Sequence, residues 1–187
     1  MAYNFLELVN EINRRLNEVE LNTTTFPTAI GFYQTAKDAV NSSIRHINHE
    51  EFSWPWNHRE EEEVLSAGIV RYSYPEDAKL INMDSFRIKK NTTLNVETKK
   101  LKAMDYQEYL DNYVDHEYNT STNIRTVPRN IIRTPSQEFI FYPCPDKAYE
   151  VVYEYYQNPV SLVLHSDVPS VPKEFQHVIV DGAMFYA

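Results

Sequence analysis

The residues closest to a metal-binding motif are histidines. His46, His49 and Glu50 form the pattern HxxHE, whereas zinc metalloproteases place their two histidines four residues apart, with glutamate directly after the first. Both the spacing and the order differ here. His58 could supply a third ligand, so a hydrolase that uses His46 and His49 stays open as an alternative. Structural or solvated histidines explain the pattern better, and we expect no metal.

The other residues that could take part in catalysis or binding are also better interpreted as structural or solvated. Cys144 lies between Pro143 and Pro145 with no base beside it, which is typical of an inert thiol. The acidic run 60–63 is typical of a solvated face. With three glycines in the chain, neither a phosphate-binding loop nor a dinucleotide fingerprint can be formed. The sequence therefore favours a protein that is not an enzyme and needs no cofactor.

Composition and net charge restrict the classes of partner that the chain can bind. The 187 residues carry 18 Lys and Arg against 27 Asp and Glu, a net charge of -9, which argues against wrapping DNA through its phosphates. No apolar run approaches the length of a membrane helix, and the amino end lacks the pattern of a signal peptide. A single cysteine fits folding in the cytoplasm. We expect no membrane contact.

Hydrophobic periodicity predicts four helices. Residues 4–20 and 28–49 have apolar residues at helical spacing and are expected to pack as an antiparallel pair. Asp105 and Glu108 resemble a capping box for a short helix over 105–113. Residues 173–187 predict a closing helix.

Strand signals fill the middle of the chain. They follow an aromatic segment, Trp54-Pro55-Trp56, that needs burial. The predicted strands are 64–74, 80–88 paired with 94–101 in a hairpin, 129–133, 138–142 and 149–156. A polar surface loop is expected over 114–126.

The sequence thus predicts an α+β fold, in which the helix pair and the C-terminal helix form a helical layer beside a mainly antiparallel β-sheet domain. Residues 1–51 and 165–187 supply the helical layer, and residues 60–160 supply the β-rich part. We expect the whole chain, 1–187, to be one module.

The order of these segments resembles the head-to-tail adaptor proteins of tailed bacteriophages, the connector or tail tubular protein A type of podovirus-like necks. The segments that carry the resemblance are, in order, the helical pair, Trp54-Pro55-Trp56, 74–77, 141–146, the Tyr-rich strand to Asn158-Pro159, 162–172, and the closing helix with Asp181, Gly182, Ala183, Tyr186 and Ala187. The resemblance implies a homo-oligomeric ring, commonly twelvefold, beneath the portal protein, with no catalysis. It also implies contact with the tail nozzle or other tail proteins, synthesis in the host cytoplasm and residence in the neck of the virion.

Two surfaces follow as predictions for such a ring. Candidate contacts to other subunits or to the portal are Tyr149, Tyr153, Tyr155, Phe175, Val178, Ile179 and Tyr186. Candidates for an acidic wall, past which DNA moves without specific binding, are Glu60, Glu61, Glu62, Glu63, Asp105, Glu108 and Asp111. These acids could instead keep an aromatic-rich chain soluble. The alternative function is a carbohydrate- or receptor-binding virion module that stacks sugars on Trp54, Trp56 and the tyrosines.

Overall fold

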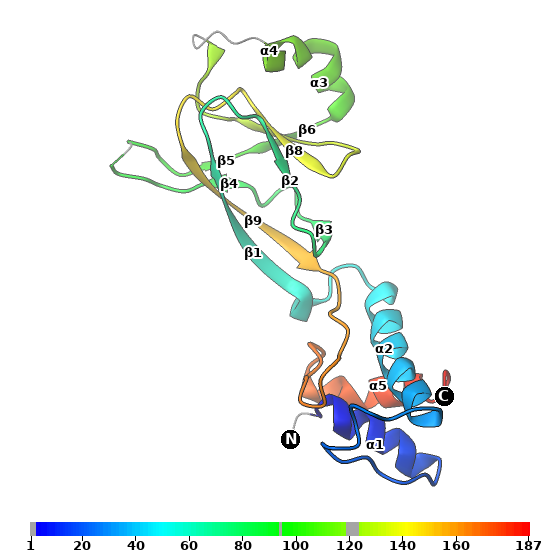
Figure 1. Cartoon of the computed structure of the whole chain (residues 1–187). Coiled ribbons are helices and arrows are strands. Elements are labelled where there is room, and N and C mark those ends of the chain that lie inside the picture. The colour runs from blue at the N-terminus through cyan, green and yellow to red at the C-terminus, as the bar shows by residue number, and fades with distance from the viewer. Residues whose placement is uncertain (1–2, 94, 119–123) are drawn as a thin grey trace. The chain divides into compact units, whose positions relative to one another are not determined.

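The computed structural model describes residues 3–93, 95–118 and 124–187. Its contacts divide the chain into two compact units (Figure 1). Unit 1 combines Met1–Asn57 with Asn158–Ala187, whereas unit 2 is the continuous segment His58–Gln157. Unit 1 is helical and unit 2 is built mainly from strands, so the predicted α+β class is confirmed. The first residue of the predicted strand 94–101 and residues 119–123 of the predicted loop lie outside the described residues.

In the described residues of unit 1, three helices pack together. They are α1 (Phe5–Arg15), α2 (Phe32–Glu50) and α5 (Gln176–Ala183), accompanied by the 3-10 turns η1 (Pro55–Asn57) and η3 (Lys173–Phe175). Their apolar stripes meet in one core, in which Leu8, Val40 and Ile179 are fully buried. The predicted packing of the N-terminal helix pair with the C-terminal helix is confirmed.

Local chemistry fixes both ends of α1. At its start the Asn4 side chain accepts the N–H of Glu7, and the Glu7 carboxylate accepts the N–H of Asn4, each at 2.9 Å. At its end Asn17 adopts a left-handed φ of 59°, and the N–H of Glu18 donates to the carbonyl of Asn13 at 2.8 Å. This Schellman arrangement terminates the helix earlier than its periodicity predicts.

Helix α2 begins later than predicted. The sequence places its start at Thr28, but the helix begins at Phe32 because Gly31 has φ 62° and ψ -131°, a conformation that strongly favours glycine. The preceding segment is held in turns by Asn22, whose Oδ1 accepts the N–H of Thr25 at 2.9 Å. The connection between α1 and α2 is therefore longer than a short turn.

Two sheets form unit 2. Sheet A has the order β1 (His58–Leu65), β9 (Tyr149–Gln157), β4 (Arg87–Ile88) and β5 (Lys99–Lys100), with β3 (Ala78–Ile81) also pairing with β9. Sheet B has the order β2 (Arg71–Ser73), β8 (Glu138–Tyr142), β7 (Asn130–Arg133) and β6 (Lys102–Met104). All pairings are antiparallel except β6 with β7.

The core of unit 2 lies between the two sheets. Burial alternates along β9, as predicted, and places Val151 and Tyr153 on the inner side. From sheet B, Phe139 and Phe141 join the same cluster. Tyr153 stacks on Phe86 with ring centroids 4.5 Å apart and planes 8° apart. The aromatic residues of the strand therefore fill a core inside one chain.

Two short helices cover the other face of sheet B. Helix α3 (Tyr106–Asn112) packs Tyr109 against Ile132 and Ile140, which point away from the first core. Helix α4 (Val114–Tyr118) occupies the start of the predicted loop. Its Glu117 receives two hydrogen bonds from the Arg71 guanidinium on β2, at 2.5 and 3.1 Å, and this pair ties α4 to the sheet.

The predicted strand 64–74 is wrong in its boundaries. The chain forms two strands there, β1 and β2, which belong to different sheets and are separated by a turn at Gly68, with φ 83°. The acidic run 60–63 lies inside β1 instead of before a strand. Pairing with β9 along the whole of β1 overrides the low strand propensity of glutamate. The predicted hairpin is confirmed in part: β4 pairs with β5, but the predicted strand 80–88 is divided between β3 and β4, which both pair with β9.

Candidate functional site

Unit 1 carries a contiguous exposed surface of large apolar residues, which we call the apolar face. One hollow of about 200 Å³ is lined by Ile47, Trp54, Trp56, Val171, Phe175 and Val178. A second hollow shares Ile47 and Val178 with the first and extends to Phe185 and Tyr186. The apolar face thus runs along α2 and α5, and monomeric proteins rarely expose such patches unless they bind a partner.

The two tryptophans form one side of the apolar face. Their rings stack with centroids 4.3 Å apart and planes 16° apart. The indole N–H of Trp54 donates to the carbonyl of Ile47 at 2.8 Å, which fixes the pair against α2. Because each ring stacks on the other, one face of each indole is covered, and the pair forms a wall of the hollow.

Several residues predicted as contacts lie on the apolar face. Phe175 is 54% exposed, Val178 42% and Tyr186 42%, whereas Ile179 is fully buried in the core of unit 1. Ile179 is therefore a packing residue. Sequence reasoning missed Phe185, which is 86% exposed. The sequence signal that could have identified Phe185 is a large aromatic residue that follows Ala183, the last buried position of α5.

Sequence reasoning also missed a second exposed apolar segment in unit 1, formed by Val160, Val163, Leu164 and Val168. The carboxylate of Asp167 accepts the N–H groups of Val163 and Leu164, both at 2.7 Å, and these bonds lower the pKa of Asp167. The loop is thus a fixed turn that presents its apolar side chains to solvent.

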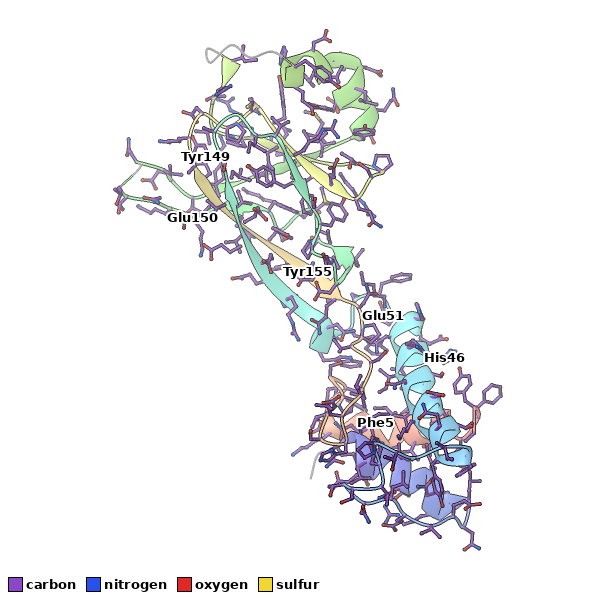
Figure 2. The ribbon with its side chains drawn as sticks, viewed as in Figure 1. Phe5, His46, Glu51, Tyr149, Glu150 and Tyr155 are labelled. Carbon is purple, nitrogen blue, oxygen red and sulfur yellow. The ribbon has the colours of Figure 1, made fainter. Side chains whose placement is uncertain are left out.

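The three tyrosines of β9 that were predicted as contacts are not surface residues in this fold. Tyr149 and Tyr153 are 2% exposed and Tyr155 is 5% exposed. Tyr149 and Tyr155, near the two ends of β9 (Figure 2), donate hydrogen bonds to Asp146 at 2.5 Å and Asp77 at 3.1 Å. Burial raises the pKa of all three phenols. The expectation that this face contacts another subunit fails because sheet B covers it.

The predicted acidic residues of β1 are accessible. Register with β9 places Glu60 and Glu62 on the outer side of sheet A, and Glu61 and Glu63 on the side of the core but at its rim. Burial, followed by the neighbouring Glu61 charge, raises the pKa of Glu63. Glu62 is paired with Lys89 at 2.6 Å, so part of this acidity is neutralised.

The second predicted acidic group lies on α3. Asp105 caps the helix by accepting the N–H groups of Gln107 at 2.8 Å and Glu108 at 3.4 Å. Asp111 accepts a hydrogen bond from the Gln107 side chain at 2.9 Å. Asp105, Glu108 and Asp111 are exposed, and within the described part of the chain none of them makes an ion pair with Lys or Arg. They form a more uniformly negative surface than β1.

The candidates for catalysis are not brought together. His46, on α2 in unit 1 (Figure 2), is largely exposed and lies 3.4 Å from Glu50, whereas His58 belongs to unit 2 and lies 3.7 Å from Glu154. Burial raises the pKa of Cys144. Among the residues that the structure describes, no three His, Cys, Asp or Glu side chains group as a metal site. In that same part of the chain, no helix combines the length and apolar character needed to cross a bilayer.

An exposed apolar face on a helical unit and charged edges on a sandwich unit are features typical of proteins that bind other proteins. Comparison with known families identifies the chain further. The sequence matches the family model described as SU10 adaptor protein over residues 3–187, and the chain belongs to this family. The resemblance to phage head-to-tail adaptors is thereby confirmed, and the family description implies a structural adaptor role and carries no catalytic implication. A search of curated proteins gave no match.

Proposed function

We propose that this chain assembles as a twelvefold ring beneath the portal protein in the neck of a phage particle. There it joins the capsid to the tail nozzle or other tail proteins and lines the conduit for DNA. The observation that carries the proposal is the apolar face of unit 1 in a chain of the adaptor family. Assembly on a filled head requires contacts that form only on a template, so the isolated chain is expected to be monomeric.

The apolar face is the surface that we assign to the portal. Phe175 and Phe185 lie at two ends of it and are its most exposed rings. Burying a phenylalanine side chain contributes about 1.5–3 kcal/mol, and each 1.4 kcal/mol changes a binding constant about tenfold. Two such rings can therefore supply much of the affinity of one subunit for a portal ring.

The test is binding of the purified chain to purified portal rings, followed by mass photometry and electron microscopy. The variant Phe175→Ser with Phe185→Ser is expected to bind at least about a hundredfold more weakly. Because both rings are largely exposed, its thermal unfolding should stay close to that of the wild type.

The matched control is Val19→Ser with Ile30→Ser, which removes two apolar side chains that are 74% and 82% exposed elsewhere in unit 1. It should bind like the wild type. A wild-type chain that stays monomeric with portal present, and leaves the portal rings undecorated, would overturn the adaptor proposal.

For the conduit wall we favour the acids of α3 over those of β1. A conduit must pass a polyanion without holding it, and unpaired carboxylates repel phosphates near the wall. Glu108 and Asp111 are exposed on one short helix, whereas Glu62 of β1 is already paired with Lys89. Screening over about 8 Å at physiological salt limits the repulsion to DNA near the surface.

Reversal of charge tests the conduit wall. Glu108→Lys with Asp111→Lys should give rings that retain double-stranded DNA in a salt-dependent manner, whereas wild-type rings should not. Glu18→Lys with Glu20→Lys makes the same change of charge in unit 1 and serves as the control. Equal DNA retention by both variants would show that total charge, and not an α3 wall, governs the effect.

A further inference from the structure

Sheet A is charged with opposite signs at its two edges. The acidic edge is β1, with the run Glu60–Glu63, and the basic edge is the β4–β5 hairpin, with Arg87 and Lys100. Lys89, which follows β4, is already paired with Glu62 of the same chain at 2.6 Å and so does not belong to the basic edge. In the order β1-β9-β4-β5, these strands stand on opposite sides of β9. A chain with a net charge of -9 has therefore gathered cations at one end of one sheet.

Both edges have backbone groups free to meet another chain. In the part of the molecule that the structure describes, β1 pairs with β9 alone and β5 pairs with β4 alone. β1 is eight residues long, and an edge strand of that length invites pairing with other chains unless charged side chains restrict it. The glutamates repel a second acidic edge and attract a basic one, so the charges determine which edge can pair with β1.

The register creates like-charge neighbours at each edge. Glu60 stands directly opposite Glu154 across β1 and β9, and Arg87 stands directly opposite Lys100 across β4 and β5. Like charges at directly opposed positions are unfavourable within a sheet. A surface of opposite sign would relieve both pairs, and each edge of sheet A has the sign that the other edge lacks.

We propose that the acidic edge of one copy docks against the basic edge of a second copy of this chain. The two surfaces are different, so the contact is head-to-tail and propagates around a ring instead of ending at a dimer. Ion pairs between side chains provide most of this contact, because β5 offers only two residues for backbone pairing. This inference rests on the proposed ring and assigns its subunit contact, which leaves the conduit wall to α3.

Charge exchange between the edges provides the test. Glu60→Lys with Glu62→Lys makes both edges basic, and Arg87→Glu with Lys100→Glu makes both edges acidic. All four residues are exposed and point to the outer side of sheet A, so the core is untouched, and the one internal ion pair that the substitution of Glu62 removes is the exposed pair with Lys89. Each variant alone is expected to form rings on the portal at least about tenfold less well than the wild type.

Two combinations should restore assembly. A single chain with all four substitutions has its edges exchanged and should form rings again. An equal mixture of the two double variants should also form rings, with alternating subunits. Rings are counted by electron microscopy of portal complexes, and added salt should reduce their number. Circular dichroism verifies the fold of each variant, and Glu18→Lys with Glu20→Lys controls for total charge.

The outcomes separate this inference from the function. If the wild type decorates portals and the edge variants do so equally well, the edges serve only to prevent aggregation and the inference is wrong. If each double variant alone fails to form rings, and neither the chain with all four substitutions nor the mixture restores them, the edges contact some other protein and the inference is also wrong. If the wild type forms no rings on the portal, the proposed function falls with it.

Discussion

A tight contact between helices α2 and α5 leads to a specific prediction about the stability of unit 1. Gly182 of α5 lies against Ser43 of α2, and a Cβ at Gly182 would stand 2.5 Å from Ser43 Oγ and 3.4 Å from Ser43 Cβ. Ser43 is 1% exposed, and its hydroxyl has no hydrogen-bond partner in the described part of the chain. Gly182→Ala should therefore clash with the hydroxyl alone.

The magnitude follows from two opposing effects. Overpacking a tight contact costs about 1–3 kcal/mol, whereas replacing a helical glycine by alanine stabilises by about 1 kcal/mol. We expect Gly182→Ala to destabilise unit 1 by about 0–2 kcal/mol. In a Ser43→Ala background the nearest atom is a Cβ at ordinary contact distance. The same change should then stabilise unit 1 by up to about 1 kcal/mol.

The assay is urea unfolding followed by tryptophan fluorescence. The chain has two tryptophans, Trp54 and Trp56, and both belong to unit 1, so the signal reports this unit. Free energies of unfolding of the wild type, the two single variants and the double variant form a double-mutant cycle. The expected coupling between Gly182→Ala and Ser43→Ala is about 1–3 kcal/mol.

Ser42→Ala is the matched control, because Ser42 precedes Ser43 on α2 but is more exposed and its hydroxyl accepts a hydrogen bond from Arg45 at 3.2 Å. Its coupling to Gly182→Ala should be near zero. A coupling below about 0.5 kcal/mol for the Ser43 pair would refute the reasoning, since distant and independent sites give values of that size.

Three further predictions concern polar groups that are wholly or partly buried. Asn10→Ala should destabilise unit 1 by about 1–3 kcal/mol in urea unfolding, because the Asn10 amide bonds both the N–H and the carbonyl of Leu21 at 2.8 Å. Phenols with raised pKa keep their protons in the folded state, so stability should fall as pH rises above about 10. Ultraviolet titration should show that Tyr109, Tyr149 and Tyr153, whose pKa burial raises, ionise only as the protein unfolds. Because burial raises its pKa, Cys144 should react with iodoacetamide more slowly in the folded protein than in denaturant, and equal rates would contradict this.

Periodic segments were the part of the fold that sequence reasoning could predict. The alternation along β9 and the apolar stripes of the helices reflect burial, which the types of residue record directly. Strand β1 escaped prediction because its glutamates have low strand propensity, and its pairing with β9 is a long-range contact that no local window contains. The left-handed backbone at Asn17 ends α1 earlier than predicted, and the one at Gly31 delays the start of α2. The spacing of apolar residues contains no information about these conformations.

The candidate surfaces were predictable only in part. A pattern of residues can show that a strand has an apolar side, but not whether a second sheet or another chain covers that side. Tyr153 was therefore expected at an interface and lies in a core. On α5, Val178 and Ile179 are adjacent in sequence, yet one is exposed and the other buried, because neighbouring residues of a helix point in different directions.

The division into units also sets an order of biosynthesis. Unit 2 is continuous in the sequence, and its first and last strands bring His58 opposite Tyr156, so all of its strands emerge from the ribosome before Asn158–Ala187 does. Unit 1 begins first but finishes last, because α1 and α2 leave part of their core open until α5 emerges. A chain whose residues 158–187 are still inside the ribosome would thus present a finished sheet unit together with two helices that have an uncovered apolar stripe, the form of nascent chain that chaperones retain.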